Sequence, residues 1–105
     1  MKTAIDIHNE AVIAAQTAEK AYIDKHGEPW FCGFAWVTIK PATSKFARAL
    51  KASGVARAAY GGGLSVWNPG GSQTQSMDVK EAGAWAYVNV LNANGIPASM
   101  GSRAD

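Results

Sequence analysis

The sequence predicts an α+β domain: a small, mainly antiparallel sheet of three to four strands, with a long N-terminal helix and two further helices packed on it. Three observations predict this class. Alanine-rich helical stretches stand near both ends of the chain, an apolar stretch rich in aromatic residues follows the first of them, and short glycine-bounded stretches lie between. With 105 residues, the chain fits a single domain spanning 1–105.

The first element is a helix predicted over residues 3–26. Thr3 is a good N-cap, and Asp6 stands three residues later in a box-like arrangement. Alanine is abundant in this stretch and favours helix. The apolar surface is broad and made mostly of small residues, which permits close packing. Gly27 follows two cationic residues and suits the C-terminal cap.

The second element is a strand predicted over Trp30–Lys40. It is apolar on both faces, with aromatic residues at positions 30, 34 and 36 on one side. Gly33 and Ala35 make the opposite face flat. We expect the first helix to lie against that flat face.

A short helix is expected after Pro41. Thr43 or Ser44 supplies its cap, and the helix ends near Ser53 before Gly54. The cations expected on its outer side are Lys45, Arg48 and Lys51.

Two short strands are then predicted, over residues 55–60 and 64–68. Gly61, Gly62 and Gly63 join them and allow a hairpin or a close backbone approach. A phosphate-cradling loop is the weaker interpretation, because no helix follows in the spacing that such a loop needs.

The last helix is predicted over residues 78–93. Asp78 and Glu81 form a capping box, and Asn94-Gly95 ends the helix. Residues 96–101 add a possible edge strand, and residues 101–105 are expected to form a tail.

Helices on one face leave the aromatic side chains of the sheet's other face uncovered. A second copy of the chain would cover them, so we expect a homo-oligomer, most simply a homodimer. The charged fraction of 17% lies below the usual value of about 25% and leaves room for such a partner.

Composition and charge indicate a folded protein of the cytoplasm. Apolar residues make up 48% of the chain, and the net charge is +2. The weak positive charge permits phosphate contacts, but a nucleic-acid binder usually carries a denser basic face. Cys32 is the one cysteine, and neither a signal peptide nor a membrane-spanning stretch is expected, nor is a membrane partner.

The polar stretch from Gly70 to Ser76 is the leading candidate for a binding site. Its glycines expose backbone amides, its side chains donate and accept hydrogen bonds, and the positive end of a helix dipole follows. Asp78 opposes an anion there, so a polar neutral group such as a base or ribose fits as well. The predicted ligand-binding residues are Tyr60, Trp67, Gln73, Thr74, Gln75, Ser76, Arg57 and Arg103.

Each of these predictions has a structural alternative. The polar stretch can be only a connection between elements. Tyr60, Trp67 and Trp36 could form an aromatic wall that stacks on a base or sugar. Tyr60 and Trp67 are equally consistent with the core, and for Trp36 the core is the favoured interpretation. Arg57 and Arg103 can instead be solvated or paired with an acid such as Asp105.

No catalytic or metal-binding pattern is recognisable, so we expect neither an enzyme nor a cofactor. His8 and His26 lie far apart with no ligand cluster near them, and His8 is expected to be solvated. Cys32 is expected to be a buried, inert thiol. The stretches typical of serine hydrolases and of P-loops are missing.

Several segments resemble small uncharacterised proteins encoded by tailed bacteriophages. They are Gly33-Phe34-Ala35-Trp36-Val37, Tyr60 to Pro69, Thr74-Gln75-Ser76 with Ala82-Gly83-Ala84, and Ser102-Arg103-Ala104-Asp105. The resemblance covers residues 30–105 better than the first helix. It implies an accessory protein acting in the cytoplasm of an infected host cell, and it carries no established activity.

The sequence leads to three hypotheses of function. The first is a small accessory protein that recognises a polar or phosphorylated, nucleotide-like molecule through the loop 67–80. The alternative is a protein–protein interaction module that inhibits or adapts a host factor through an exposed aromatic sheet face. The third and weakest hypothesis is nucleic-acid binding through Lys45, Arg48 and Lys51.

Overall fold

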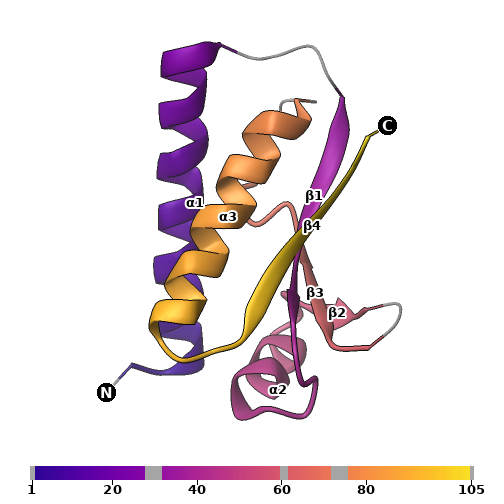
Figure 1. Ribbon diagram of the computed structural model, residues 1–105. Coiled ribbons are helices and arrows are strands. Elements are labelled where there is room, and N and C mark those ends of the chain that lie inside the picture. The colour runs from indigo at the N-terminus through magenta and orange to yellow at the C-terminus, as the bar shows by residue number, and fades with distance from the viewer. Residues whose placement is uncertain (1, 28–31, 60–61, 72–75, 105) are drawn as a thin grey trace.

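The computed structural model describes residues 2–27, 32–59, 62–71 and 76–104 of the chain. These residues form three helices and a four-stranded antiparallel sheet, which confirms the predicted α+β fold (Figure 1). The elements in chain order are α1 (Ala4–His26), β1 (Gly33–Ile39), α2 (Lys45–Ala52), β2 (Arg57–Ala58), β3 (Leu64–Trp67), α3 (Met77–Ala93) and β4 (Ala98–Ala104).

The strands are ordered β2-β3-β1-β4, so the first strand in sequence lies in the interior of the sheet. β1 pairs with β4 along its whole length, from Gly33 opposite Ala104 to Ile39 opposite Ala98. On its other side β1 pairs with β3, and Trp36 lies opposite Trp67. An interior position agrees with the apolar character of both faces of β1.

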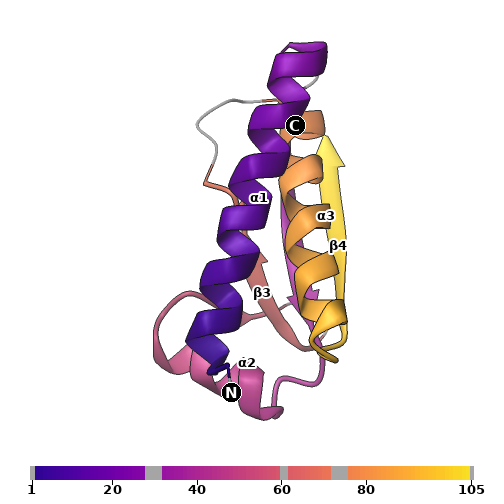
Figure 2. The same cartoon turned by 90° about the vertical axis from the view of Figure 1, so that its left-hand side faces the viewer.

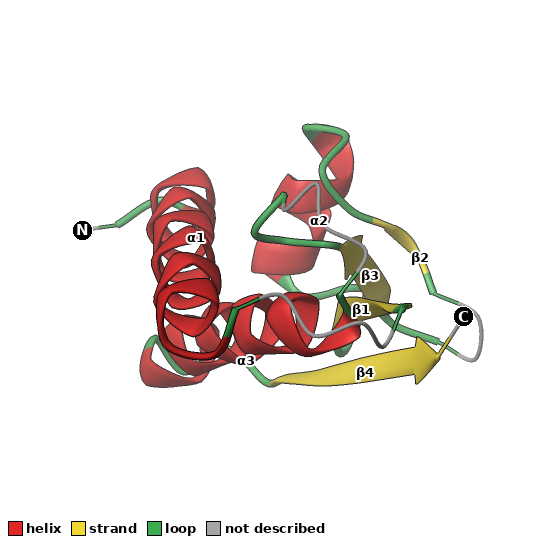
Figure 3. Cartoon of the chain, turned by 90° about the horizontal axis from the view of Figure 1, so that it is seen from above, coloured by secondary structure: helices red, strands yellow, loops and turns green. Residues whose placement is uncertain are grey.

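The helices form two layers on one face of the sheet. α3 lies against β1 and β4, and α1 packs on the outer side of α3 (Figures 2 and 3). The expectation that α1 covers the flat face of β1 was therefore wrong. A helix covered on two sides must be apolar on two sides, and α3 is such a helix. α3 buries Val79, Gly83, Ala84, Tyr87, Val88 and Leu91, whereas α1 buries only Ala11, Ala15 and Glu19.

The hydrophobic core lies between these helices and the sheet. Ala35, Val37 and Ile39 of β1 point into it, together with Leu64 and Val66 of β3. Because side chains alternate along a strand, the residues between them point to the opposite face, which no described helix covers (Figure 3).

The starts of the helices follow their capping signals. Thr3 and Asp6 form the predicted capping box of α1, and Ser44 caps α2. α3 differs from the prediction, because Ser76 and not Asp78 is its N-cap. Both residue types cap well, and here the Ser76 hydroxyl accepts the hydrogen bond from the amide of Val79.

Two strand predictions change in length. Within the described residues 55–59 of the predicted strand 55–60, only Arg57–Ala58 is strand, because the amide of Val55 donates to the carbonyl of Leu50 at the end of α2. The last strand extends to Ala104 instead of ending at 101, since β1 offers a full-length partner for it. Most of the expected tail is therefore part of the sheet.

Candidate functional site

The face of the sheet turned away from the helices carries aromatic and cationic side chains in register. On β1 these are Phe34 and Trp36. Arg103 of β4 lies opposite Phe34, and Trp67 of β3 lies opposite Trp36. Arg57 of β2 extends the same face, because it pairs with Ser65, two residues from Trp67. Four strands thus bring residues from distant parts of the sequence to one surface.

The aromatic rings form a connected cluster. The ring centroids of Trp36 and Trp67 are 5.0 Å apart, with 39° between their planes. Phe34 meets Trp67 edge-on at 6.4 Å. Trp67 is 55% exposed, so much of its indole is accessible to a stacking partner.

Trp36 lies against the backbone of β4. A Cβ atom at position 101 would lie 2.8 Å from three atoms of its indole, so only glycine leaves room for the ring there. Trp36 is half-buried on the open face, and the prediction that it fills the core was wrong. The core side of β1 at this point is occupied by the smaller Ala35 and Val37.

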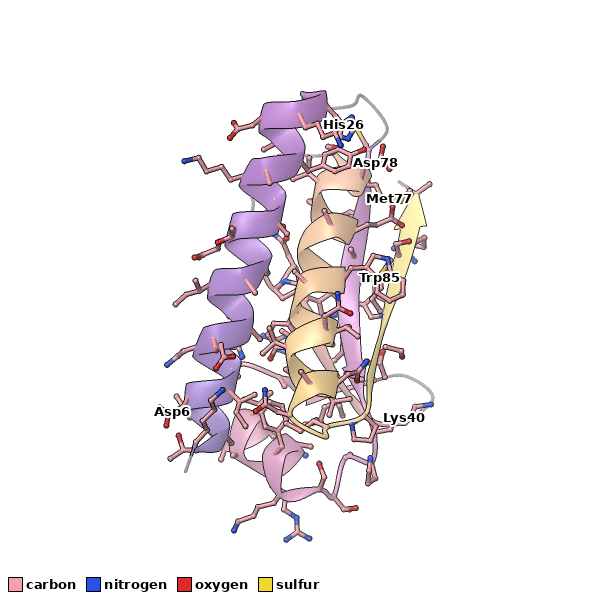
Figure 4. All side chains as sticks on the ribbon, turned by 60° about the vertical axis from the view of Figure 1, so that its left-hand side comes forward. Asp6, His26, Lys40, Met77, Asp78 and Trp85 are labelled. Atoms are coloured by element: carbon pink, nitrogen blue, oxygen red, sulfur yellow. The ribbon has the colours of Figure 1, made fainter. Side chains whose placement is uncertain are left out.

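Beside this cluster the sheet forms an open hollow of about 740 Å³, which we call the sheet hollow. Its lining includes Trp36, Lys40, Arg57, Ser65, Trp67 and Arg103. None of the described residues that line it is acidic. Figure 4 shows Lys40 at the end of the sheet next to α2. The hollow therefore combines aromatic surface with three positive charges.

Arg57 and Arg103 are both exposed, and neither forms a salt bridge with a described residue. Unpaired guanidinium groups retain their full capacity to donate to an anion. The alternative in which Arg103 pairs with Asp105 concerns a residue outside the described part of the chain.

Three of the eight predicted ligand-binding residues lie together in the sheet hollow: Arg57, Trp67 and Arg103. Four others, Tyr60, Gln73, Thr74 and Gln75, lie outside the described residues. The eighth, Ser76, is 2% exposed and accepts a hydrogen bond from the amide of Val79. Its place is at the start of α3 and not in the hollow.

Sequence reasoning missed Lys40, and for Trp36 it favoured the core over a place in a stacking surface. The alternation of β1 already placed Trp36 opposite its core face. However, the sequence did not predict which strands pair with β1 or in which register. The neighbours of Trp36 depend on that pairing: Trp67 comes from β3 and Gly101 from β4. Lys40 directly follows β1, and nothing in the sequence around it indicated that it would line a binding site.

A buried carboxylate lies apart from this hollow, between α1 and α3. Glu19 is 4% exposed, and its Oε2 receives no hydrogen bond from the described residues. Gly70 and Gly83 lie directly against the carboxylate, which leaves no room for a side chain at either position. Burial raises the pKa of Glu19 to about 7, and the positive charge of Lys80 opposes that rise.

Two expectations about single residues were wrong. His8 is half-buried, and its Nδ1 lies 2.7 Å from the hydroxyl of the buried Tyr87, because α1 packs on α3 at this point. Burial lowers the pKa of His8. Cys32 is exposed, and it lies just before β1, outside the part of the strand whose side chains enter the core. No group of three His, Cys, Asp or Glu residues in the described part could hold a metal ion.

Comparison with known proteins gives no relative: no family model, curated protein or solved structure matches the chain. The resemblance to phage proteins therefore stays a prediction. Among the described residues, no helix combines the length and apolar character needed to cross a membrane.

Proposed function

We propose that this protein binds a nucleotide-like molecule in the sheet hollow, with a base stacked on Trp67 and a phosphate held by Arg57 or Arg103. The observation that carries the proposal is the exposed indole of Trp67, supported by Trp36 at 5.0 Å. It stands between two arginines that form no salt bridge with any acidic residue the structure describes. Stacking of a base on an aromatic ring contributes about 1–3 kcal/mol, and arginine binds phosphate with two parallel hydrogen bonds.

The size and rigidity of the hollow suit such a ligand. Its volume of about 740 Å³ lies in the range of roughly 300–1,000 Å³ that small-molecule sites occupy. The aromatic residues stand on paired strands and not on loops, which holds their geometry fixed. A ligand of this kind would also explain why large aromatic side chains face away from the core.

Quenching of tryptophan fluorescence by nucleoside monophosphates tests the proposal. Trp67→Ala should weaken binding about tenfold or more, because it removes the stacking surface. Trp85→Ala is the matched control: Trp85 is 53% exposed, like Trp67, but lies on α3 (Figure 4). Arg57→Gln should weaken binding of monophosphates more than binding of nucleosides. Equal binding by Trp67→Ala and the unmodified protein would contradict the proposal.

A protein partner is the second candidate, and the adjacent exposed rings of Phe34 and Trp67 favour it. Exposed aromatic clusters are enriched in protein interfaces. In this case a host protein recovered from bacterial lysate should be lost with Trp67→Ala and retained with Trp85→Ala. Recovery of the same proteins with both variants would contradict this candidate.

A further inference from the structure

The charges of the chain are distributed unevenly along the sequence. From Pro29 to Met77 there is no acidic residue, and five cations stand in this segment: Lys40, Lys45, Arg48, Lys51 and Arg57. The rest of the chain carries the other five Lys and Arg residues together with all eight acidic residues. The net charge of +2 therefore conceals one strongly basic segment.

This basic segment supplies most of the lining of the sheet hollow and the helix at the end of the sheet. It forms β1, α2, β2 and β3. Lys40, just before α2, and Arg57, just after it, both line the hollow. α2 lies at the end of the sheet where β1 ends (Figure 1). Basic residues in the hollow are thus continuous in sequence with those on α2.

The cations of α2 point away from the core. Phe46, Ala47 and Leu50 form the buried side of this helix, and Lys45, Arg48 and Lys51 are all exposed. No described acidic residue forms a salt bridge with any of them. Arg57 and Arg103 would neutralise the phosphate of a single nucleotide in the hollow. The cations of α2 would then have no phosphate to contact.

We infer that the ligand of the sheet hollow is part of a single-stranded nucleic acid, whose backbone continues past Lys40 onto α2. This inference rests on the proposed function. A chain of phosphates can contact the cations of the hollow and, beyond Lys40, those of α2, and each contact releases counterions. A single strand fits better than a duplex, because its bases are free to stack on Trp67. An acidic protein segment would match the charges but has no base to stack.

Fluorescence titration compares thymidine monophosphate with oligothymidylates of about four and about twelve nucleotides, a range that single-strand sites span. We expect the longest oligonucleotide to bind at least about tenfold more tightly than the monophosphate, and its affinity to fall steeply with salt. A duplex of the same length should bind more weakly than the single strand.

Two double variants that remove the same number of positive charges show whether the cations of α2 contribute to binding more than cations elsewhere on the surface. Lys45→Gln with Lys51→Gln should weaken binding of the longest oligonucleotide several-fold and lower its salt slope by about 1.4, roughly 0.7 for each lost phosphate contact, while binding of the monophosphate stays unchanged. Lys20→Gln with Lys25→Gln, on the exposed side of α1, should change neither.

The outcomes distinguish this inference from the proposed function. If the monophosphate binds but length brings no gain, or if both double variants weaken the oligonucleotide equally, the inference is wrong and the proposed function stands. If neither ligand binds and Trp67→Ala changes nothing, both are wrong. Binding of an acidic peptide in competition with the oligonucleotide, insensitive to Trp67→Ala, would also overturn the inference.

Discussion

At the scale of single residues, Gly101 determines how Trp36 lies in the sheet hollow. The two residues are direct neighbours across β1 and β4, and the indole of Trp36 occupies the space that a side chain at position 101 would need. A strand normally disfavours glycine, so its presence here indicates that the close approach of the ring is what the position requires.

Gly101→Ala should therefore displace Trp36 without unfolding the protein. We expect a loss of stability of about 1 kcal/mol, because the ring can move outward from an open face. Binding of a monophosphate should weaken several-fold as Trp67 loses its support. Fluorescence titration and urea unfolding measure the two effects. Ala104→Ser, an exposed change near the end of the same strand, is the control. Unchanged fluorescence and binding would show that Trp36 is not held by this contact.

Glu19 makes the stability of the fold depend on pH. Its pKa rises from 4.5 to about 7 on folding, so the folded state binds a proton more strongly than the unfolded state. The free energy of unfolding that this group contributes is fully present below pH 4.5 and is lost as the pH rises through about 7.

Glu19→Gln removes this titration and keeps the shape of the side chain. Relative to the unmodified protein, the variant should gain about 2 kcal/mol of stability between pH 5 and pH 8. Urea unfolding at both pH values measures it. Glu10→Gln, on the same helix but exposed and paired with Lys2 at 2.8 Å, should show no comparable gain. If the free energy of unfolding changes with pH in the same way for Glu19→Gln and the unmodified protein, the Glu19 carboxyl does not titrate as a buried group.

At the scale of elements, the sequence was most informative where a local signal suffices. Thr3, Asp6 and Gly27 fix both ends of α1, and the apolar stretch of β1 predicts an interior strand. The signals failed where the answer depends on a distant partner. Which helix covers the sheet, and how far β4 extends, are decided by pairing with β1 and packing on α3. The order of residues along the chain does not by itself show which helix covers the sheet or how far β4 extends.

The candidate site shows the same division. Trp67, Arg57 and Arg103 were predicted from local context, as aromatic or cationic residues near glycines and polar loops. Their assembly into one hollow depends on the strand order β2-β3-β1-β4, which brings the last strand of the chain beside the first. In the polar loop, Ser76 and Asp78 both had good helix-start chemistry, and local context did not show that Ser76 is the cap. The prediction for Gln73, Thr74 and Gln75 lies outside the described residues.

Ser76→Ala tests this assignment at the start of α3. Loss of the cap should lower stability by about 1 kcal/mol, since the amide of Val79 loses its acceptor. Ser44→Ala, which removes the corresponding cap of α2, should have a similar cost. Binding of a monophosphate should be unchanged in both variants at temperatures where they are folded. A selective loss of binding in Ser76→Ala would instead restore Ser76 as a ligand contact.

At the scale of the whole molecule, the arrangement is one-sided. Two layers of helix cover one face of the sheet, and the other face exposes Phe34 and Trp67 in a chain with only 17% charged residues. Such a face gains stability from any apolar cover, whether a base or another protein surface. A ligand and a second copy of the chain would compete for the same rings.

The predicted homodimer can therefore be tested through this competition. Light scattering of the free protein should give a mass above 11.0 kDa that rises with concentration, and a saturating nucleotide should return it to 11.0 kDa. Trp67→Glu should remain monomeric without ligand, because a charge in the centre of an apolar contact is costly to bury. Trp85→Glu should self-associate like the unmodified protein, since Trp85 lies on α3 and not on the open face. A mass of 11.0 kDa at every concentration would contradict the homodimer. Self-association that persists in Trp67→Glu would show that the two copies meet at another surface of the molecule.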